Sequence, residues 1–144
     1  MKVLLDTCVI SELVSKQPTP KVVGFVDSLD PEDVYLSVIT IGEIAKGIEM
    51  LPKSRRKRDL HTWLKEDLLV RFEGNILPLD TDVLLEWGAL TARLESAGKT
   101  MPAMDSLIAA SALSKKMMLV TRNVSDFEDA AVEIVNPWKQ DGLG

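Results

Sequence analysis

The sequence is short of cysteine, histidine and long apolar runs, and each shortage excludes a class of protein. With Cys8 as its one cysteine, the chain cannot form an intramolecular disulfide. No apolar run approaches the roughly eighteen residues that a membrane-spanning helix needs. The N-terminus lacks a signal pattern, because charged Lys2 is followed by only three apolar residues before Asp6. We therefore expect a soluble cytoplasmic protein with no membrane partner.

Positive charge is also scarce. The chain has 17 Lys and Arg against 22 Asp and Glu, a net charge of −5. Static nucleic-acid binders neutralise phosphates and are usually basic, so this balance disfavours one. It is compatible with an enzyme that clusters carboxylates around divalent cations and meets nucleic acid through them. With 144 residues and 46% hydrophobic content, we expect one domain over residues 1–138 and a loose tail at 139–144.

Short apolar runs alternate with helical patterns along the sequence. The runs predict strands at 3–5, 34–38, 75–79, 117–121 and 132–135. Helical spacing of apolar residues occurs between them, at 8–14, 21–29, 40–51, 60–68, 80–97 and 102–116. Neighbouring parallel strands need crossover connections, which such helices supply. The pattern therefore predicts an α/β fold with a central parallel sheet and helices on both faces.

Acidic residues stand where predicted strands end or helices begin. They are Asp6 after the first strand, Glu43 and Asp105 in the first turns of two helices, and Asp126 after the fourth strand. In a parallel sheet these positions meet at one edge, where α/β folds place their sites. Taken singly, Asp6 could be no more than a helix cap, and Glu43 could be no more than a solvated acid favoured by the helix dipole.

Clustered carboxylates repel one another and are costly unless a cation sits among them. Oxygen ligands without accompanying histidine or cysteine select Mg²⁺, with Mn²⁺ as a substitute, over zinc. A pocket of this kind suits phosphodiester hydrolysis, because bound ions activate water and stabilise the attacking and leaving oxygens. The sequence therefore predicts a metal-dependent hydrolase site.

The chain resembles the PIN-domain ribonucleases, and among them the toxins of VapBC-type toxin–antitoxin pairs. The resemblance spans nearly the whole chain and is carried by short motifs in order. These are Leu5-Asp6-Thr7 with Ser11-Glu12-Leu13, Gly42-Glu43, Asp105-Ser106-Leu107-Ile108-Ala109-Ala110, Leu119-Val120-Thr121-Arg122-Asn123 with Asp126-Phe127, and Val135-Asn136-Pro137-Trp138. The resemblance implies a three-layer α/β/α domain, with a sheet of four to five strands, that cleaves RNA with Mg²⁺ or Mn²⁺.

The resemblance also assigns roles to residues. It implies that Asp6, Glu43 and Asp105 are catalytic and hold the metal, and that Thr7 and Thr121 are supporting hydroxyls. The sequence departs from the family's pattern at the fourth acid. Many relatives have an aspartate two residues after the threonine of strand four, where this chain has Asn123. Either Asp126 or Asn123 could take that place, so the number of bound metal ions, one or two, remains open.

A partner is implied as well. Such toxins are inhibited by a small DNA-binding antitoxin, whose C-terminal segment lies in an apolar groove and presents a basic residue to the acids. The resemblance further implies a homodimer, a toxin–antitoxin hetero-oligomer, and an RNA substrate that could be transfer, ribosomal or messenger RNA.

Gly47, costly in a helix interior, suggests that another group approaches one turn after Glu43.

The one dense positive run has two interpretations. Its members Arg55, Arg56, Lys57 and Arg58 could contact RNA phosphates, or they could form an ordinary solvated face.

Other chemistries fit the residues less well. The segment Gly98-Lys99-Thr100 resembles the end of a P-loop, but Arg93 stands where the first glycine should be. Cys8 and His61 could in principle form a thiol hydrolase, but His61 lies on a highly charged predicted helix where nothing orients it. An aspartate-nucleophile phosphatase needs a second acid where Cys8 stands. The remaining alternatives are a non-catalytic PIN-like binding module and a PIN nuclease of RNA maturation without an antitoxin.

Overall fold

A computed structural model describes residues 1–140 of the chain. In that part of the chain, five parallel strands form one sheet in the order β3-β2-β1-β4-β5. The strands are β1 (Val3–Leu5), β2 (Val34–Ser37), β3 (Ile76–Leu77), β4 (Met118–Val120) and β5 (Ile134–Val135). The predicted α/β fold with a central parallel sheet is therefore confirmed.

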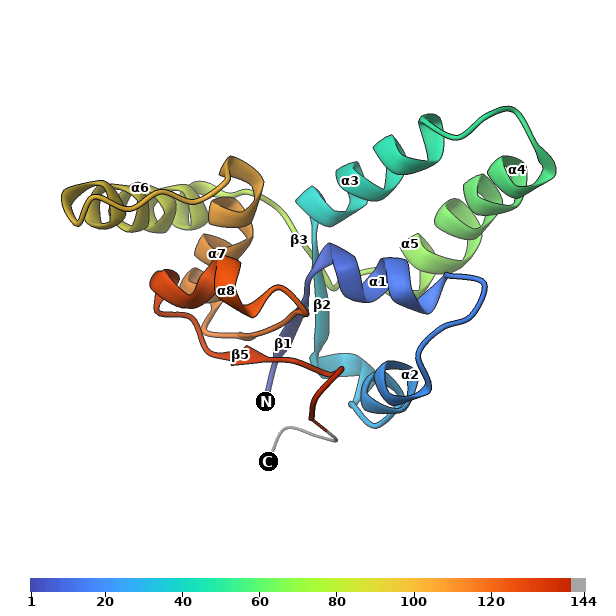
Figure 1. Cartoon of the computed structure of the whole chain (residues 1–144), viewed down its shortest axis with the longest axis horizontal. Helices are drawn as coiled ribbons and strands as arrows, with labels where there is room; N and C mark the ends of the chain where they lie inside the picture. The colour runs from blue at the N-terminus through green and yellow to red at the C-terminus, as the bar shows by residue number, and fades with distance from the viewer. Residues whose placement is uncertain (141–144) are drawn as a thin grey trace.

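Helices cover both faces of this sheet (Figure 1). One face carries α1 (Thr7–Leu13), α2 (Pro20–Asp27), α3 (Val38–Glu49), α4 (Arg55–Thr62) and α5 (Leu69–Arg71), with a π-helical segment, Trp63–Leu68, between the last two. The other face carries α6 (Thr81–Ser96), α7 (Ala103–Lys115) and α8 (Val124–Phe127). Short 3₁₀ turns occur at Pro31–Asp33 and Glu128–Ala130.

The alternation of side chains along β1 divides the core into two. Val3 and Leu5 pack into the cluster formed with α1 to α5, whereas Leu4 packs into the cluster formed with α6 to α8. All three side chains are completely buried. A strand buried on both faces reads as a continuous apolar run, which is why the run in the sequence predicted it. The three-layer α/β/α arrangement follows.

The register of the sheet places the candidate site. Leu5 pairs with Val120 across β1 and β4, so the residues after them, Asp6 and Thr121, leave the sheet side by side. The backbone N–H of Asp6 donates to the carbonyl of Val120 at 2.9 Å. The first and fourth strands therefore end together, although more than a hundred residues separate them.

Two predicted boundaries differ from the structure. Strand β2 ends at Ser37, because the Ser37 hydroxyl accepts a hydrogen bond from the backbone N–H of Ile39 at 3.0 Å and starts α3 at Val38, two residues early. The strand predicted at 75–79 is reduced to Ile76–Leu77, since Pro78 has no N–H to continue the ladder.

The C-terminal boundary also shifts. Lys139 and Gln140 were expected in a loose tail, but their backbone N–H groups both donate to the carbonyl of Asn136 at 3.0 Å. The rest of that predicted tail, 141–144, lies outside the described residues. None of the helices within residues 1–140 is both long and apolar enough to cross a membrane.

Candidate active site

Asp6 is the most constrained of the predicted acids. It caps α1 by accepting a hydrogen bond from the backbone N–H of Thr7 at 2.9 Å, and its other oxygen accepts one from the Thr121 hydroxyl at 2.8 Å. The thiol of Cys8 lies 3.7 Å from that second oxygen. Burial raises the pKa of the Asp6 carboxyl, and the charge of Glu43 adds to this, while the bonds from Thr121 and Thr7 oppose it. Asp6 thus caps α1 and stands at the centre of the contacts of the candidate site.

Thr7 joins Glu43 to the first strand. Its hydroxyl donates to Glu43 Oε1 at 2.6 Å and lies 3.0 Å from the hydroxyl of Thr40. Thr40 is completely buried on the first turn of α3, one turn before Glu43, and the sequence reasoning missed it. Because α3 starts at Val38, Glu43 lies in the second helical turn and not the first as predicted. The supporting role predicted for Thr7 agrees with these contacts.

Asp105 shows that the four acids share one region. It lies in the first turn of α7 and is partly buried. Burial raises the pKa of its carboxyl to about 6, and the charges of Asp6, Asp126 and Glu43 add to this in that order. Charge repulsion shifts a pKa in this way only between groups that lie close together in space. The topology therefore brings the four predicted acids to one edge of the sheet.

The segment after β4 supplies the two candidates for the fourth position. Asn123 precedes α8, a short helix that the sequence reasoning did not predict, and its backbone N–H donates to the Thr121 hydroxyl at 3.0 Å. Asp126 lies in the first turn of α8, exposed to solvent, and its charge acts on Asp105. Of the two, Asp126 contributes charge at the site.

The donor set suits a hard cation, because all four groups are carboxylates and therefore supply oxygen ligands. Within residues 1–140, however, no three acidic, histidine or cysteine side chains form a ready-made metal-ligand group. The described chain therefore brings carboxylate oxygens within electrostatic range of Asp105, but it does not arrange them as a coordination sphere.

The proposed thiol dyad does not form. Cys8 contacts Asp6 and Thr121, whereas His61 lies on α4 with its Nε2 3.0 Å from Glu49. Burial raises the pKa of the Cys8 thiol, which keeps it protonated and poorly nucleophilic. The thiol hydrolase alternative is excluded on geometry.

An apolar groove of about 170 Å³ begins beside Glu43 and runs between α1, α3 and α4. Its lining residues are Thr7, Ser11, Val14, Glu43, Ile44, Gly47, Ile48, Leu51, Leu60 and Trp63. No described part of this chain approaches Gly47 closely, because a Cβ built there would meet nothing within 4 Å. Gly47 instead leaves the floor of the groove open.

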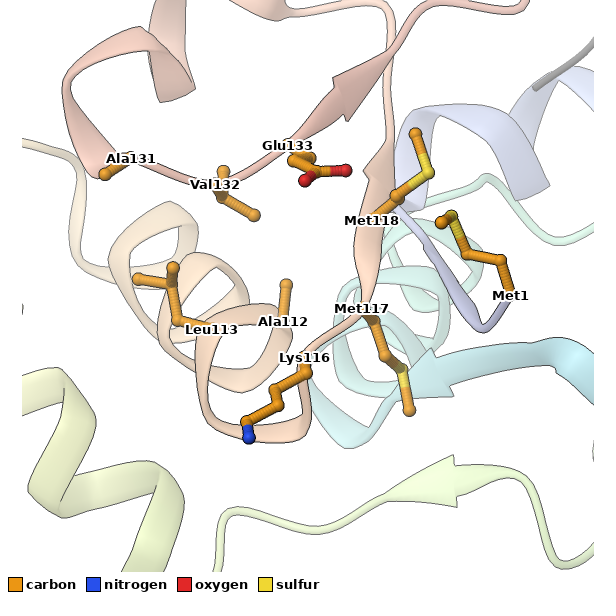
Figure 2. Close-up of a pocket in the computed structure, with 9 residues that line it drawn as sticks. All are labelled: Met1, Ala112, Leu113, Lys116, Met117, Met118, Ala131, Val132 and Glu133. Atoms are coloured by element: carbon orange, nitrogen blue, oxygen red, sulfur yellow. The ribbon is translucent and has the colours of Figure 1, made fainter. Parts of the chain in front are cut away.

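A second hollow, of about 320 Å³, lies at the opposite edge of the sheet (Figure 2). Side chains from the end of α7, the start of β4 and the segment before β5 surround it, together with Met1. None of the four acids lines it. It therefore belongs to the amino ends of the strands and not to the candidate site.

The basic run is only partly available to a ligand. Lys57 Nζ donates to the carbonyls of Glu49 and Leu51 at 3.0 and 3.1 Å, and Arg56 donates to the carbonyl of Val14 at 3.4 Å. Arg55 and Arg58 are exposed. Two of the four predicted RNA-contact residues, Arg56 and Lys57, thus donate hydrogen bonds to backbone carbonyls at the C-terminal ends of helices, where cations are favoured.

The sequence of the chain is similar to a known protein family and to individual proteins. The family model described as "PIN domain" matches residues 3–133. The chain is 40% identical over 136 residues to Toxin FitB of Neisseria gonorrhoeae, covering 94% of this chain and 98% of the relative. It is 35% identical over 137 residues to VapC ribonuclease Y4jK of Sinorhizobium fredii, covering 95% and 98%.

Solved structures share the fold. FitAcB from Neisseria gonorrhoeae superposes with a TM-score of 0.91 at 39% identity, covering 96% of this chain and 99% of that one. A DNA-bound VapBC from Salmonella typhimurium gives a TM-score of 0.79 at 26% identity, covering 95% and 98%. The similarity therefore extends over nearly the whole chain.

Proposed function

The chain belongs to the PIN-domain family, and from that premise we propose that it is a Mg²⁺-dependent endoribonuclease that serves as the toxin of a toxin–antitoxin pair. The proposal is carried by the gathering of four carboxylates at one edge of the sheet, where Thr7 and Thr121 hold Asp6 and Glu43. Burial first, and then the charges of Asp6, Asp126 and Glu43, raise the pKa of Asp105 there. Such a cluster is stabilised by a divalent cation and is costly without one. The names of the relatives, a toxin and a ribonuclease, support the same activity.

The metal would be held by Asp6, Glu43 and Asp105, with Asp126 contributing charge, and Mn²⁺ would substitute for Mg²⁺. When bound, the ion would activate water and stabilise negative charge on the phosphate oxygens. The chain's own residues orient the ligands. Thr121 and the backbone N–H of Thr7 fix the two oxygens of Asp6, and the Thr7 hydroxyl fixes Glu43.

Protons compete with the metal at Asp105. Because the pKa of its carboxyl is raised to about 6 in the metal-free chain, the group is half protonated at that pH. Ligand carboxylates must be ionised, so metal affinity should fall as the pH drops through this range. Cleavage supported by a fixed, subsaturating Mg²⁺ concentration should therefore fall between about pH 7 and pH 5.

The apolar groove would hold the antitoxin. Ile44, Ile48 and Trp63 offer an apolar surface on α3 and the helical segment after α4, and Glu43 lies in the same lining. An apolar segment ending in a basic side chain would bury its apolar residues here and meet the acids with its charge. The related structures of FitAB bound to a DNA fragment and of DNA-bound VapBC support a DNA-binding partner. The homodimer and the cytoplasmic location, where cellular RNA lies, are parts of the same proposal.

Cleavage of total cellular RNA by the purified chain tests the activity. We expect cleavage with Mg²⁺ or Mn²⁺, none with a chelator, and none by Asp6→Asn. Asp82→Asn is the matched control, because Asp82 is an exposed acid in the first turn of α6, outside the site. Thermal unfolding of each variant shows whether it is folded.

The outcomes separate the remaining alternatives. Absence of cleavage in every condition, from folded chain freed of any partner, would point to a non-catalytic binding module. Cleavage without a small copurifying DNA-binding protein, and with no such protein encoded beside this chain, would point to an RNA-maturation nuclease. Mapping the ends of the products identifies which class of RNA is cut.

A further inference from the structure

An RNA chain approaching this site meets negative charge. The protein carries a net charge of −5, and the site gathers four carboxylates. RNA phosphates bind through cations, so a cationic side chain at the rim would add to the attraction of a bound metal ion. Arg56 and Lys57 are engaged with backbone carbonyls. Another cationic side chain, that of Arg122, lies at the same edge of the sheet.

Arg122 stands at that edge. It directly follows Thr121, whose hydroxyl contacts Asp6, and its backbone N–H faces the thiol of Cys8 at the start of α1. Its side chain is exposed, and its guanidinium lies 5.3 Å from the centre of the Trp138 ring. Within residues 1–140, no carboxylate forms an ion pair with it. The backbone of Arg122 therefore adjoins the candidate site, whereas its guanidinium lies on Trp138.

Trp138 is a fixed support for that guanidinium. Its backbone N–H donates to Asn136 Oδ1 at 3.0 Å, and the backbone N–H of Asn136 in turn donates to Gln140 Oε1 at 3.2 Å. The Trp138 side chain is half-buried and packs on the core cluster that contains α1. An arginine stacked on a fixed ring keeps the donors at its edge free and loses little conformational entropy when they bind.

We propose that Arg122, held on the Trp138 ring, binds a backbone phosphate of single-stranded RNA next to the phosphate that is cut. This inference rests on the proposed nuclease function and names a substrate-binding residue for it. The guanidinium matches a phosphate with paired N–H donors, which a lysine cannot do. Arg122 positions the substrate and takes no part in proton transfer.

The test compares Arg122→Gln with Lys139→Gln. Lys139 is an exposed cation in the turn that carries Trp138, so its loss changes the net charge equally. Binding of a fluorescently labelled RNA oligonucleotide is measured by anisotropy over a range of salt concentrations, and cleavage kinetics are measured with Mg²⁺. For Arg122→Gln we expect Kd and KM to rise about tenfold at low salt and kcat to stay within about twofold. The slope of log Kd against log salt should fall by about 0.7, the value for one single-strand phosphate contact.

The ring is tested separately. Trp138→Leu should reproduce most of the loss in affinity, whereas Trp138→Phe should retain most of the wild-type value, because it keeps an aromatic face. Thermal unfolding identifies any variant that is merely destabilised, and Arg122→Gln, changed at an exposed side chain, keeps the test valid if Trp138→Leu does not fold.

An Arg122→Gln protein with the Kd and salt slope of Lys139→Gln would overturn the proposal. An unchanged Kd in folded Trp138→Leu would overturn the role of the ring. If the wild type cleaves no RNA, the proposed nuclease function fails, and the anisotropy measurement still decides whether Arg122 binds RNA.

Discussion

Replacing Asp105 with asparagine should stabilise the metal-free protein while abolishing cleavage. In the folded chain, the pKa of Asp105 is raised from 3.8 to about 6, mainly by burial and then by the neighbouring acids. The ionised carboxylate is therefore unfavourable in the folded state, and an asparagine of similar shape removes the charge. A group placed for function at a cost in stability is common in active sites.

The magnitude follows from that pKa. A rise from 3.8 to about 6 corresponds to roughly 3 kcal/mol, at about 1.4 kcal/mol per pKa unit. Solvent reaches part of the side chain and screens the repulsion, so we reduce the expected gain to about 1–2 kcal/mol. A gain of this size raises Tm by roughly 3–6 °C in a domain of this length.

The gain should depend on pH with a definite sign. Above pH 6 the folded wild type carries the unfavourable charge, so the variant is more stable by the full amount. Between pH 6 and 3.8 the folded wild type holds a proton that the unfolded chain does not, so its stability rises as the pH falls. The difference between the two proteins should vanish below about pH 4.

Urea unfolding with a chelator present, at pH 7.5, 5 and 3.8, measures this difference. Asp82→Asn is again the control, and we expect it to be unchanged or slightly less stable at pH 7.5, because it loses a favourable charge from a helix start. Adding Mg²⁺ should stabilise the wild type more than Asp105→Asn. A variant that is less stable than wild type at pH 7.5, or a difference that persists at pH 3.8, would refute the reasoning.

Three further substitutions test individual contacts. Thr121→Val removes the hydroxyl that donates to Asp6 and accepts from Asn123, which should cost about 2 kcal/mol of unfolding free energy by urea titration; an unchanged midpoint contradicts it. Gly47→Ala meets nothing within 4 Å, so it should stabilise the free chain by up to about 1 kcal/mol yet weaken antitoxin binding in calorimetry; unchanged affinity would place the partner elsewhere. Asp126→Asn should lower the pKa of Asp105, followed by carboxyl NMR, and unchanged cleavage and metal affinity would remove Asp126 from the catalytic set.

Local sequence was enough to predict the sheet and the edge that carries the acids. The apolar run at Val3–Leu5 is buried on both faces, and such a run is visible without any tertiary information. Asp6 follows it and caps α1, as the capping interpretation of the sequence predicted, and its role at the site stays a prediction. Errors occurred where one side chain redirected the backbone, as Ser37 did by ending β2.

The partners of the site residues could not be predicted in the same way. Thr40 became part of the site because Thr7, 33 positions away in the sequence, reaches it. Lys57 resembled an RNA contact by composition, but the end of α3 lies within reach of its ammonium group. Such contacts depend on how the helices pack against one another, and that packing cannot be predicted from the residues adjacent in the sequence.

The sequence by itself determined where the five strands fall along the chain, the acids near their ends and the absence of an intramolecular disulfide, because these depend on periodicity, capping and residue type. Only the tertiary structure decided that the pKa of Asp105 rises to about 6 and that Arg122 lies on Trp138. The physical reason is that electrostatic and ring interactions fall with distance through space. The parallel register, which brings the ends of β1 and β4 together, sets those distances.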